Sequence, residues 1–170
     1  MSRHFGRKKI SIVIAGLFLL GAGGGTVWLL TLHKPAAVDP FDAKTLASVD
    51  FPLYYPLQIP KGFRTDPKSV TEPQSGVVVF DMKDSKGRKI FVSEEARSST
   101  YNYGGFFNGI ERSSQFKAQF GAAITGYLNN EQNVVGSIVS QKTWVIVNAK
   151  AGDTSPAQLK TIIATLAASH

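Results

Sequence analysis

The sequence contains no cysteine and only three histidines among its 170 residues. Without cysteine, the chain has no disulfide framework, no thiol nucleophile and no site for a lipid attached through sulfur. The histidines, His4, His33 and His170, flank an apolar segment or end the chain. No histidine therefore lies in the interior of the expected folded domain, where a catalytic triad or a metal site would usually need one. We expect no metal and no cofactor.

The sequence also has little surplus positive charge outside its N-terminal region. The formal net charge is +7, but Arg3, Arg7, Lys8, Lys9 and Lys34 all flank the same apolar segment. After residue 34 the remaining Lys and Arg nearly balance the 12 Asp and Glu residues. A nucleic-acid surface needs cations clustered on the folded part of the chain. We therefore expect no nucleic-acid partner.

The apolar segment runs from Ile10 to Leu32 without a charged residue. As a helix it would be about 34 Å long, enough to cross a hydrocarbon core of roughly 30 Å. Most of the flanking positive residues precede it, which predicts residues 1–9 in the cytoplasm and the rest of the chain outside. Gly21 and Gly25 are spaced for close helix contact, so a homodimer within the bilayer is one expectation.

A cleaved signal peptide is the alternative interpretation of this segment. The basic start and the small residues from Gly21 to Gly25 fit it. Apolar residues resume at Val27, however, which makes the stretch longer than the apolar region of a usual signal peptide. We therefore predict an uncleaved transmembrane helix over 10–32 in the cell membrane.

The chain outside the membrane begins with proline-rich segments. Residues 33–50 show no clean periodicity and predict a linker, which leaves 51–170 as an extracytoplasmic domain. Prolines at 52, 56 and 60 exclude a central strand and a helix interior. An extended edge segment fits better, followed by another that Pro67 interrupts.

Strand signals follow in two groups. Residues 76–82 and 88–95 predict a hairpin, and 120–128, 133–140 and 143–149 predict three further strands. The short connections within the second group require antiparallel neighbours. The last strand is apolar on both faces, which implies a covering layer.

The C-terminal segment predicts a helix that supplies this layer. Ser155, Pro156 and Gln158 form an expected capping box with proline in the first turn. One apolar stripe follows, made of Leu159, Ile162, Ile163 and Leu166. The predicted fold class is α+β: an N-terminal transmembrane helix, then a curved antiparallel sheet packed with a C-terminal helix.

The stretch "YNYGGFFNGI", Tyr101 to Ile110, combines aromatic residues with glycines. Helical spacing places the aromatic residues and Ile110 on one face, where they would pack as core. The other face would carry four small or polar residues, Gly104, Gly105, Asn108 and Gly109. This bare face is our candidate interaction site, because it would let another chain approach closely.

Candidate catalytic groups are few. Glu94 and Glu95 are adjacent on a predicted strand, so their side chains point to opposite faces and do not converge on one substrate. Ser93 and Lys89 leave a residual alternative, a Ser-dependent envelope hydrolase, although no motif singles them out. We expect no enzymatic activity.

The order of elements is similar to that of a known group of bacterial proteins. "YYPLQIPKGF", "GVVVFDM", "RKIFVSEE" and "GYLNNEQNVVGSIVSQKTWVIVNA" are followed by a closing helix. Over about residues 50–168 this resembles the uncharacterised outer domains of small single-pass bacterial membrane proteins, of the anti-sigma-factor-like or sporulation-associated kind. Such domains look like half of the lipoprotein-carrier and periplasmic stress-sensor fold. The resemblance implies a bacterial surface location and a binding or regulatory role, and it transfers no site residue.

These features lead to three expected functions. The preferred one is a non-catalytic, membrane-anchored binding module whose partner is an envelope protein or the cell wall. The alternative is a carrier of lipid or lipoprotein with an apolar cavity between sheet and helix. The third, with the least support, is the Ser-dependent envelope hydrolase.

Overall fold

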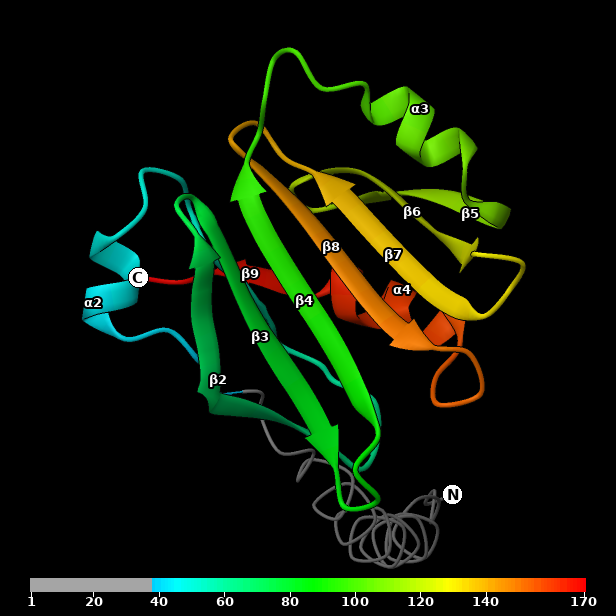
Figure 1. The fold of residues 1–170 in the computed structure, drawn as a ribbon, viewed down its shortest axis with the longest axis horizontal. Coiled ribbons are helices and arrows are strands. Elements are labelled where there is room, and N and C mark those ends of the chain that lie inside the picture. The colour runs from blue at the N-terminus through cyan, green and yellow to red at the C-terminus, as the bar shows by residue number, and fades with distance from the viewer. Residues whose placement is uncertain (1–37) are drawn as a thin grey trace, which may run out of the picture. The chain divides into compact units, whose positions relative to one another are not determined.

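The computed structural model describes residues 38–170. The main element of this part of the chain is a seven-stranded antiparallel sheet (Figure 1). Its strand order is β2-β3-β4-β8-β7-β6-β5. The strands are β2 (Phe63–Gln74), β3 (Val77–Asp84), β4 (Lys89–Ala96), β5 (Glu111–Ala118), β6 (Gly121–Leu128), β7 (Asn133–Val139) and β8 (Thr143–Lys150). Two short strands, β1 (Tyr54–Pro56) and β9 (Leu166–Ala168), pair only with each other. The helices are α2 (Ala43–Ala47), α3 (Tyr103–Asn108) and α4 (Pro156–Ala164).

The predicted transmembrane helix, with Gly21 and Gly25, lies outside the described residues. Between residues 38 and 170, no helix is long and apolar enough to cross a membrane. The membrane anchor, its orientation and its dimerisation therefore stay predictions.

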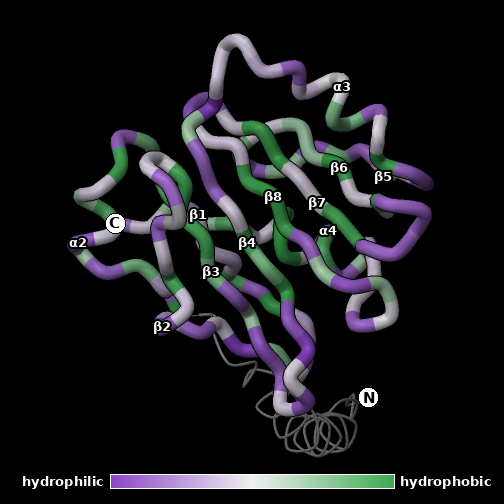
Figure 2. Tube along the Cα trace, in the orientation of Figure 1, coloured by the Kyte–Doolittle hydropathy of each residue, from purple (hydrophilic) through white to green (hydrophobic). Residues whose placement is uncertain are grey.

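The predicted α+β class is wrong, because the fold is mostly β, with 50% strand and 15% helix. Much of the strand content that the sequence did not predict lies at the two edges of the sheet. At one edge β2 continues through Pro67, where a register shift against β3 accommodates the irregular backbone. At the other edge the sequence of β5 is polar except for Phe116 and Ala118 near its end, and it forms a strand by pairing with β6. Both edge strands are largely hydrophilic (Figure 2).

Both groups of predicted strands are confirmed. The expected hairpin is β3 with β4, paired from Val77 with Glu95 to Lys83 with Lys89. The second group forms β6, β7 and β8, joined as antiparallel neighbours by short turns. In the turn after β6, Asn129, Asn130 and Glu131 all have positive φ. This left-handed backbone lets the chain reverse within a few residues, at a site where Asn is a favourable residue.

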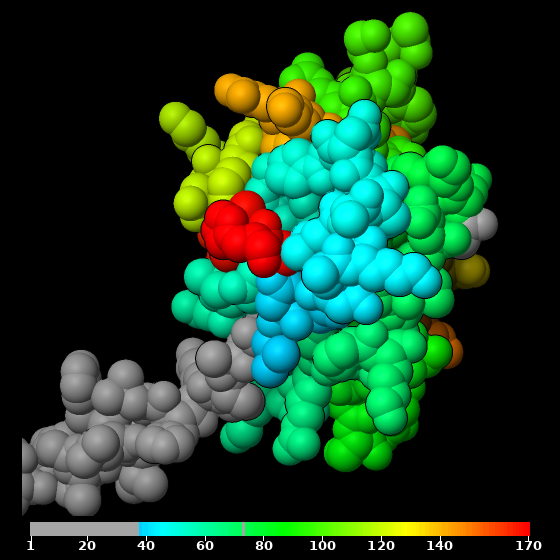
Figure 3. Space-filling view, turned by 90° about the vertical axis from the view of Figure 1, so that its left-hand side faces the viewer, coloured from blue at the N-terminus to red at the C-terminus, as the bar shows by residue number. Residues whose placement is uncertain are grey.

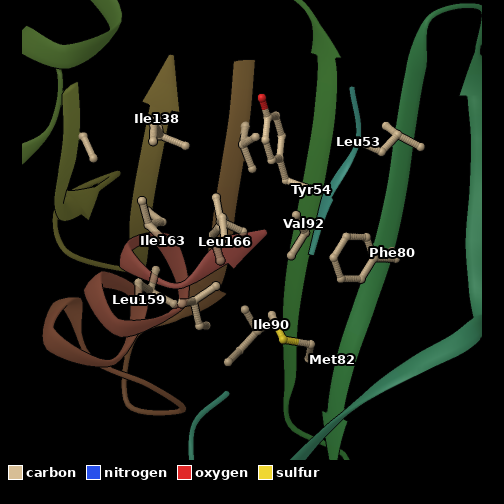
Figure 4. Packing of buried hydrophobic residues seen from close by; sticks show 14 of the residues in the cluster. Leu53, Tyr54, Phe80, Met82, Ile90, Val92, Ile138, Leu159, Ile163 and Leu166 are labelled. Atoms are coloured by element: carbon tan, nitrogen blue, oxygen red, sulfur yellow. The ribbon is translucent and has the colours of Figure 1, made fainter. Parts of the chain in front are cut away.

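We call the face of the seven-stranded sheet that contacts α4 the inner face. Leu159, Ile162 and Ile163 of α4 are buried, and the helix packs against β6 and β7 (Figure 1). Figure 4 shows Leu159 and Ile163 in this packing. The predicted capping box is confirmed: the Ser155 side chain accepts from the Gln158 backbone, and the Gln158 side chain accepts from the Ser155 backbone. The helix ends at Ala164, earlier than the apolar stripe predicts, and Leu166 belongs to β9.

Gly136 of β7 sets how closely α4 approaches the sheet. A Cβ atom at this position would lie 2.4 Å from Cδ1 of Ile163. The missing side chain therefore allows Ile163 to contact the strand backbone directly, so helix and sheet are packed without a gap at this point.

The segment 51–58, which contains β1, crosses the inner face beside α4, and we call it the strap. Leu53 and Tyr54 are buried, and the backbone carbonyl of Leu53 accepts from the Ser169 N–H. The Ser169 hydroxyl donates to Asp39 Oδ2 at 2.6 Å, which joins the two ends of the described chain. Figure 3 shows the C-terminal residues in red against the segment that includes α2 and the strap.

The folded part begins before residue 51, within the predicted linker. Phe41 is buried and its ring meets that of Phe80 edge-on, with centroids 5.4 Å apart. Asp42 caps α2 by accepting a hydrogen bond from the Thr45 N–H. Residues 39–47 therefore pack as part of the domain, whose core continues across the inner face as far as Phe63.

Candidate binding surface

The opposite face of the sheet, which we call the outer face, is covered by α3 over one part only. Ile110, Ile124 and Val135 form a small buried cluster there, with Phe106 and Phe107 of α3 packed against it. This cluster is separate from the main core on the inner face. The predicted amphipathic helix in the aromatic-glycine stretch is confirmed, and its aromatic side chains are packing residues.

Trp144 of β8 anchors the aromatic residues at the start of α3. Its ring centroid lies 5.1 Å from that of Tyr103 and 5.2 Å from that of Phe106, both in edge-on contacts. Its indole N–H donates to the Ser137 hydroxyl at 2.8 Å, so the polar group of this buried ring has a hydrogen-bond acceptor. Tyr101 packs on the same ring at 4.6 Å and is 45% exposed, so it forms the solvent edge of the group.

Gly126 of β6 allows the chain after α3 to approach the sheet. A Cβ atom there would lie 2.5 Å from the backbone oxygen of Glu111 and 2.5 Å from Cγ2 of Ile110. The β5–β6 pairing is shifted at this point, and Arg112 has a φ of 47°. The Arg112 side chain forms an exposed ion pair with Glu131 at 2.8 Å.

The residues of the predicted interaction face lie on the exposed side of α3. Gly104, Gly105, Asn108 and Gly109 are all exposed, as the helical spacing predicts. Asn102 caps the helix through its side-chain oxygen, which accepts from the Gly105 N–H at 2.9 Å. The structure thus brings these four residues together, while their role in binding stays a proposal.

The larger open region of the outer face lies on β3, β4 and β8. Pairing places Val79, Ser93 and Ile146 in one row across the three strands. The next row contains Asp81, Phe91 and Asn148, and the Phe91 side chain is 42% exposed. We call these six residues the open patch: Val79, Asp81, Phe91, Ser93, Ile146 and Asn148. Phe91 is the exposed member; the other five are half-buried, and Ile146 also packs against the small cluster beneath α3.

Charged groups border the open patch toward the β3–β4 turn. Lys83 Nζ lies 2.9 Å from Asp66 Oδ2, and Lys89 Nζ lies 3.3 Å from Asp81 Oδ2. The hydrogen bond from Lys83 lowers the pKa of Asp66, and the same bond raises the pKa of Lys83. The border therefore presents alternating, internally paired charges rather than a field of one sign.

The geometry brings no catalytic set together at this surface. Ser93 and Lys89 are four residues apart on β4, which separates their Cα atoms by about 13 Å along the strand. Lys89 faces Asp81 instead of Ser93. Among residues 38–170, no cluster of three or more His, Cys, Asp or Glu side chains is arranged to hold a metal ion.

The two adjacent glutamates point to opposite faces, as predicted, and their environments differ. Glu94 is completely buried on the inner face, whereas Glu95 lies on the outer face beside Trp144. The alternation of Ile90, Val92 and Glu94 on one side of β4 is the signal that identifies the buried position. Partial burial also raises the pKa of Glu95.

Comparison of the whole chain with models of protein families, with curated proteins and with solved structures found no match. The resemblance to outer domains of bacterial membrane proteins therefore stays a prediction, and the open patch is argued from its own geometry.

Proposed function

We propose that this protein is a membrane-anchored, non-catalytic binding module, and that the open patch binds another protein of the cell envelope. The observation that carries the proposal is the exposed Phe91 ring, with half-buried Val79 and Ile146 beside it on β3 and β8, in a domain whose inner face already holds the main core. An exposed apolar area with a polar border is typical of a protein-binding site.

The composition of the patch favours a protein partner. Phe91, Val79 and Ile146 supply apolar contact area, and an exposed aromatic residue is a common anchor of an interface. The paired charges of Asp66, Asp81, Lys83 and Lys89 leave the border close to neutral. An anionic wall polymer or lipid surface would be better matched by an excess of cations.

The other expected functions have less support. A Ser-dependent hydrolase needs a base within hydrogen-bond reach of the nucleophile, and Lys89 faces away from Ser93. A carrier needs space between the sheet and α4, where Ile163 lies directly on the backbone at Gly136. The anchor and the extracytoplasmic location rest on the sequence of residues 1–34.

Site-specific photo-crosslinking in the native membrane tests the proposal. A photoreactive phenylalanine analogue is placed at position 79, at position 91, or at Leu57 as a control. Leu57 is 52% exposed and belongs to the strap, so it matches Phe91 in exposure but not in location. We expect one protein adduct of the same mass from positions 79 and 91, and none from position 57.

A second arm replaces Asp81 with Lys while the photoreactive group stays at position 79. This change breaks the paired charges at the border, and we expect the adduct to decrease severalfold. An adduct of twice the chain mass would mean that a second copy occupies the patch. That result, an adduct with lipid or wall fragments, or equal capture from position 57 would overturn the proposed partner.

A further inference from the structure

Glu94 is a buried acid that the proposed binding function does not use. Its side chain has no solvent exposure, and Oε2 accepts a hydrogen bond from the Tyr54 backbone N–H at 2.8 Å. Its other oxygen, Oε1, is buried and has no hydrogen-bond partner among the described residues. An ionised carboxylate would carry its charge into an apolar core with one hydrogen bond, which is strongly unfavourable.

The groups around Glu94 supply no compensating positive charge. Its neighbours on β3 and β8 are Val78 and Val145, both buried. None of the ion pairs formed within residues 38–170 includes Glu94. Burial raises the pKa of Glu94 well above its usual range, the Tyr54 N–H opposes this, and the nearby negative charge of Asp39 adds to it.

The hydrogen bond to Tyr54 connects this acid to the strap. The strap is also tied to the sheet by Thr143, whose hydroxyl donates to the Pro52 carbonyl at 2.7 Å. Asp39, the charged group that acts on Glu94, accepts from the Ser169 hydroxyl at the C-terminal end. Glu94 therefore lies beneath the place where the strap and both ends of the described chain meet.

We propose that Glu94 is a proton-dependent latch: its neutral form holds the strap against the inner face, and loss of the proton loosens the strap. The folded state binds this proton more tightly than the unfolded chain does. The stabilisation is therefore complete at acid pH and is lost as the pH rises through the raised pKa of Glu94. This inference goes beyond the proposed function, which needs only the outer face.

Hydrogen exchange of the full-length chain in detergent micelles tests the latch. The measured quantity is the ratio of protection in residues 51–58 to protection in residues 133–139 of β7, between about pH 6 and about pH 9. In the wild type we expect the opening equilibrium of the strap to rise by up to about tenfold per pH unit between the ordinary pKa of a glutamate and the raised pKa of Glu94, and to level off above the raised pKa. The ratio within one chain cancels the chemical pH dependence of exchange.

Two variants at adjacent positions provide the matched comparison. Glu94→Gln keeps a carbonyl that accepts from Tyr54 but cannot ionise, so we expect a ratio that does not change with pH. Glu95→Gln removes the acid on the outer face, and it should follow the wild type. A constant ratio in the wild type, or the same rise in Glu94→Gln, would overturn the latch. The wild-type ratio decides the question even if Glu94→Gln does not fold.

Discussion

The two faces of the seven-stranded sheet share the same strands but are covered to different extents. On the inner face, α4, the strap and β9 bury nearly every side chain, from Phe63 at one edge to Ala123 near the other. On the outer face, α3 covers a small cluster and leaves Phe91 exposed. The main core on the inner face therefore supplies most of the stability of the fold, while part of the outer face stays accessible to a partner.

The comparison extends to one glycine on each face. Gly136 makes room for Cδ1 of Ile163, the mobile end of a side chain. Gly126 makes room for the backbone oxygen of Glu111, which can move only with its strand. At Gly126 the close contact thus includes backbone that cannot adjust alone, whereas at Gly136 it is with the end of a side chain that can.

The largest expected effect comes from truncating the inner core. Leu159→Ala removes a fully buried side chain of α4 and should lower the free energy of unfolding by about 3 kcal/mol. Phe106→Ala on the outer face should cost about 1.5 kcal/mol, because that ring is only half-buried. Denaturant titration measures both. Equal losses would contradict the claim that the inner face dominates stability.

Substitutions at Gly126 and Gly136 compare the cost of a collision with backbone with the cost of a collision with a side chain. Gly126→Ala should cost about 2 kcal/mol, because its Cβ would collide with the Glu111 backbone, and Gly136→Ala about 1 kcal/mol. Hydrogen exchange should show faster opening of α3 and the start of β5 only in Gly126→Ala. A larger loss for Gly136→Ala would show that Ile163 cannot move aside.

A change in the open patch should affect binding but not folding. Phe91→Ser replaces an exposed ring and should change the free energy of unfolding by less than about 0.5 kcal/mol. Crosslinking from position 79 should nevertheless fall by at least tenfold, since an anchor residue of the interface is lost. Leu57→Ser is the control, with a similar effect on stability and no effect on the adduct.

The smallest expected effect concerns the glycines of α3. Gly104→Ala should raise the free energy of unfolding by about 0.5 kcal/mol, because glycine is a poor helix former and the added Cβ would lie at an ordinary contact distance, 3.5 Å, from Asn102 Oδ1. Gly105→Ala should give no gain, since its Cβ would lie 2.8 Å from the capping amide of Asn102. If Gly104→Ala also weakens crosslinking, the binding surface extends from the open patch to this helix.

Local patterns in the sequence predicted the central strands, the C-terminal helix and the amphipathic α3, because each depends on periodicity or capping within a few residues. They did not predict β5, whose polar residues become a strand through the neighbouring edge of β6. The burial of Glu94 depends on the strap crossing above it, a contact between residues 40 positions apart. The open patch likewise depends on which part of the outer face α3 leaves uncovered.

Side-chain footprinting of the open patch tests the central claim most directly. The full-length protein is labelled with a carbene reagent, once after purification in detergent and once in native membranes, and labelling of Phe91 is compared with that of Leu57. We predict that Phe91 is labelled in the purified protein and at least severalfold less in membranes, whereas Leu57 is labelled equally in both. Equal labelling of Phe91 in the two samples would contradict the assignment of the outer face as the partner-binding surface.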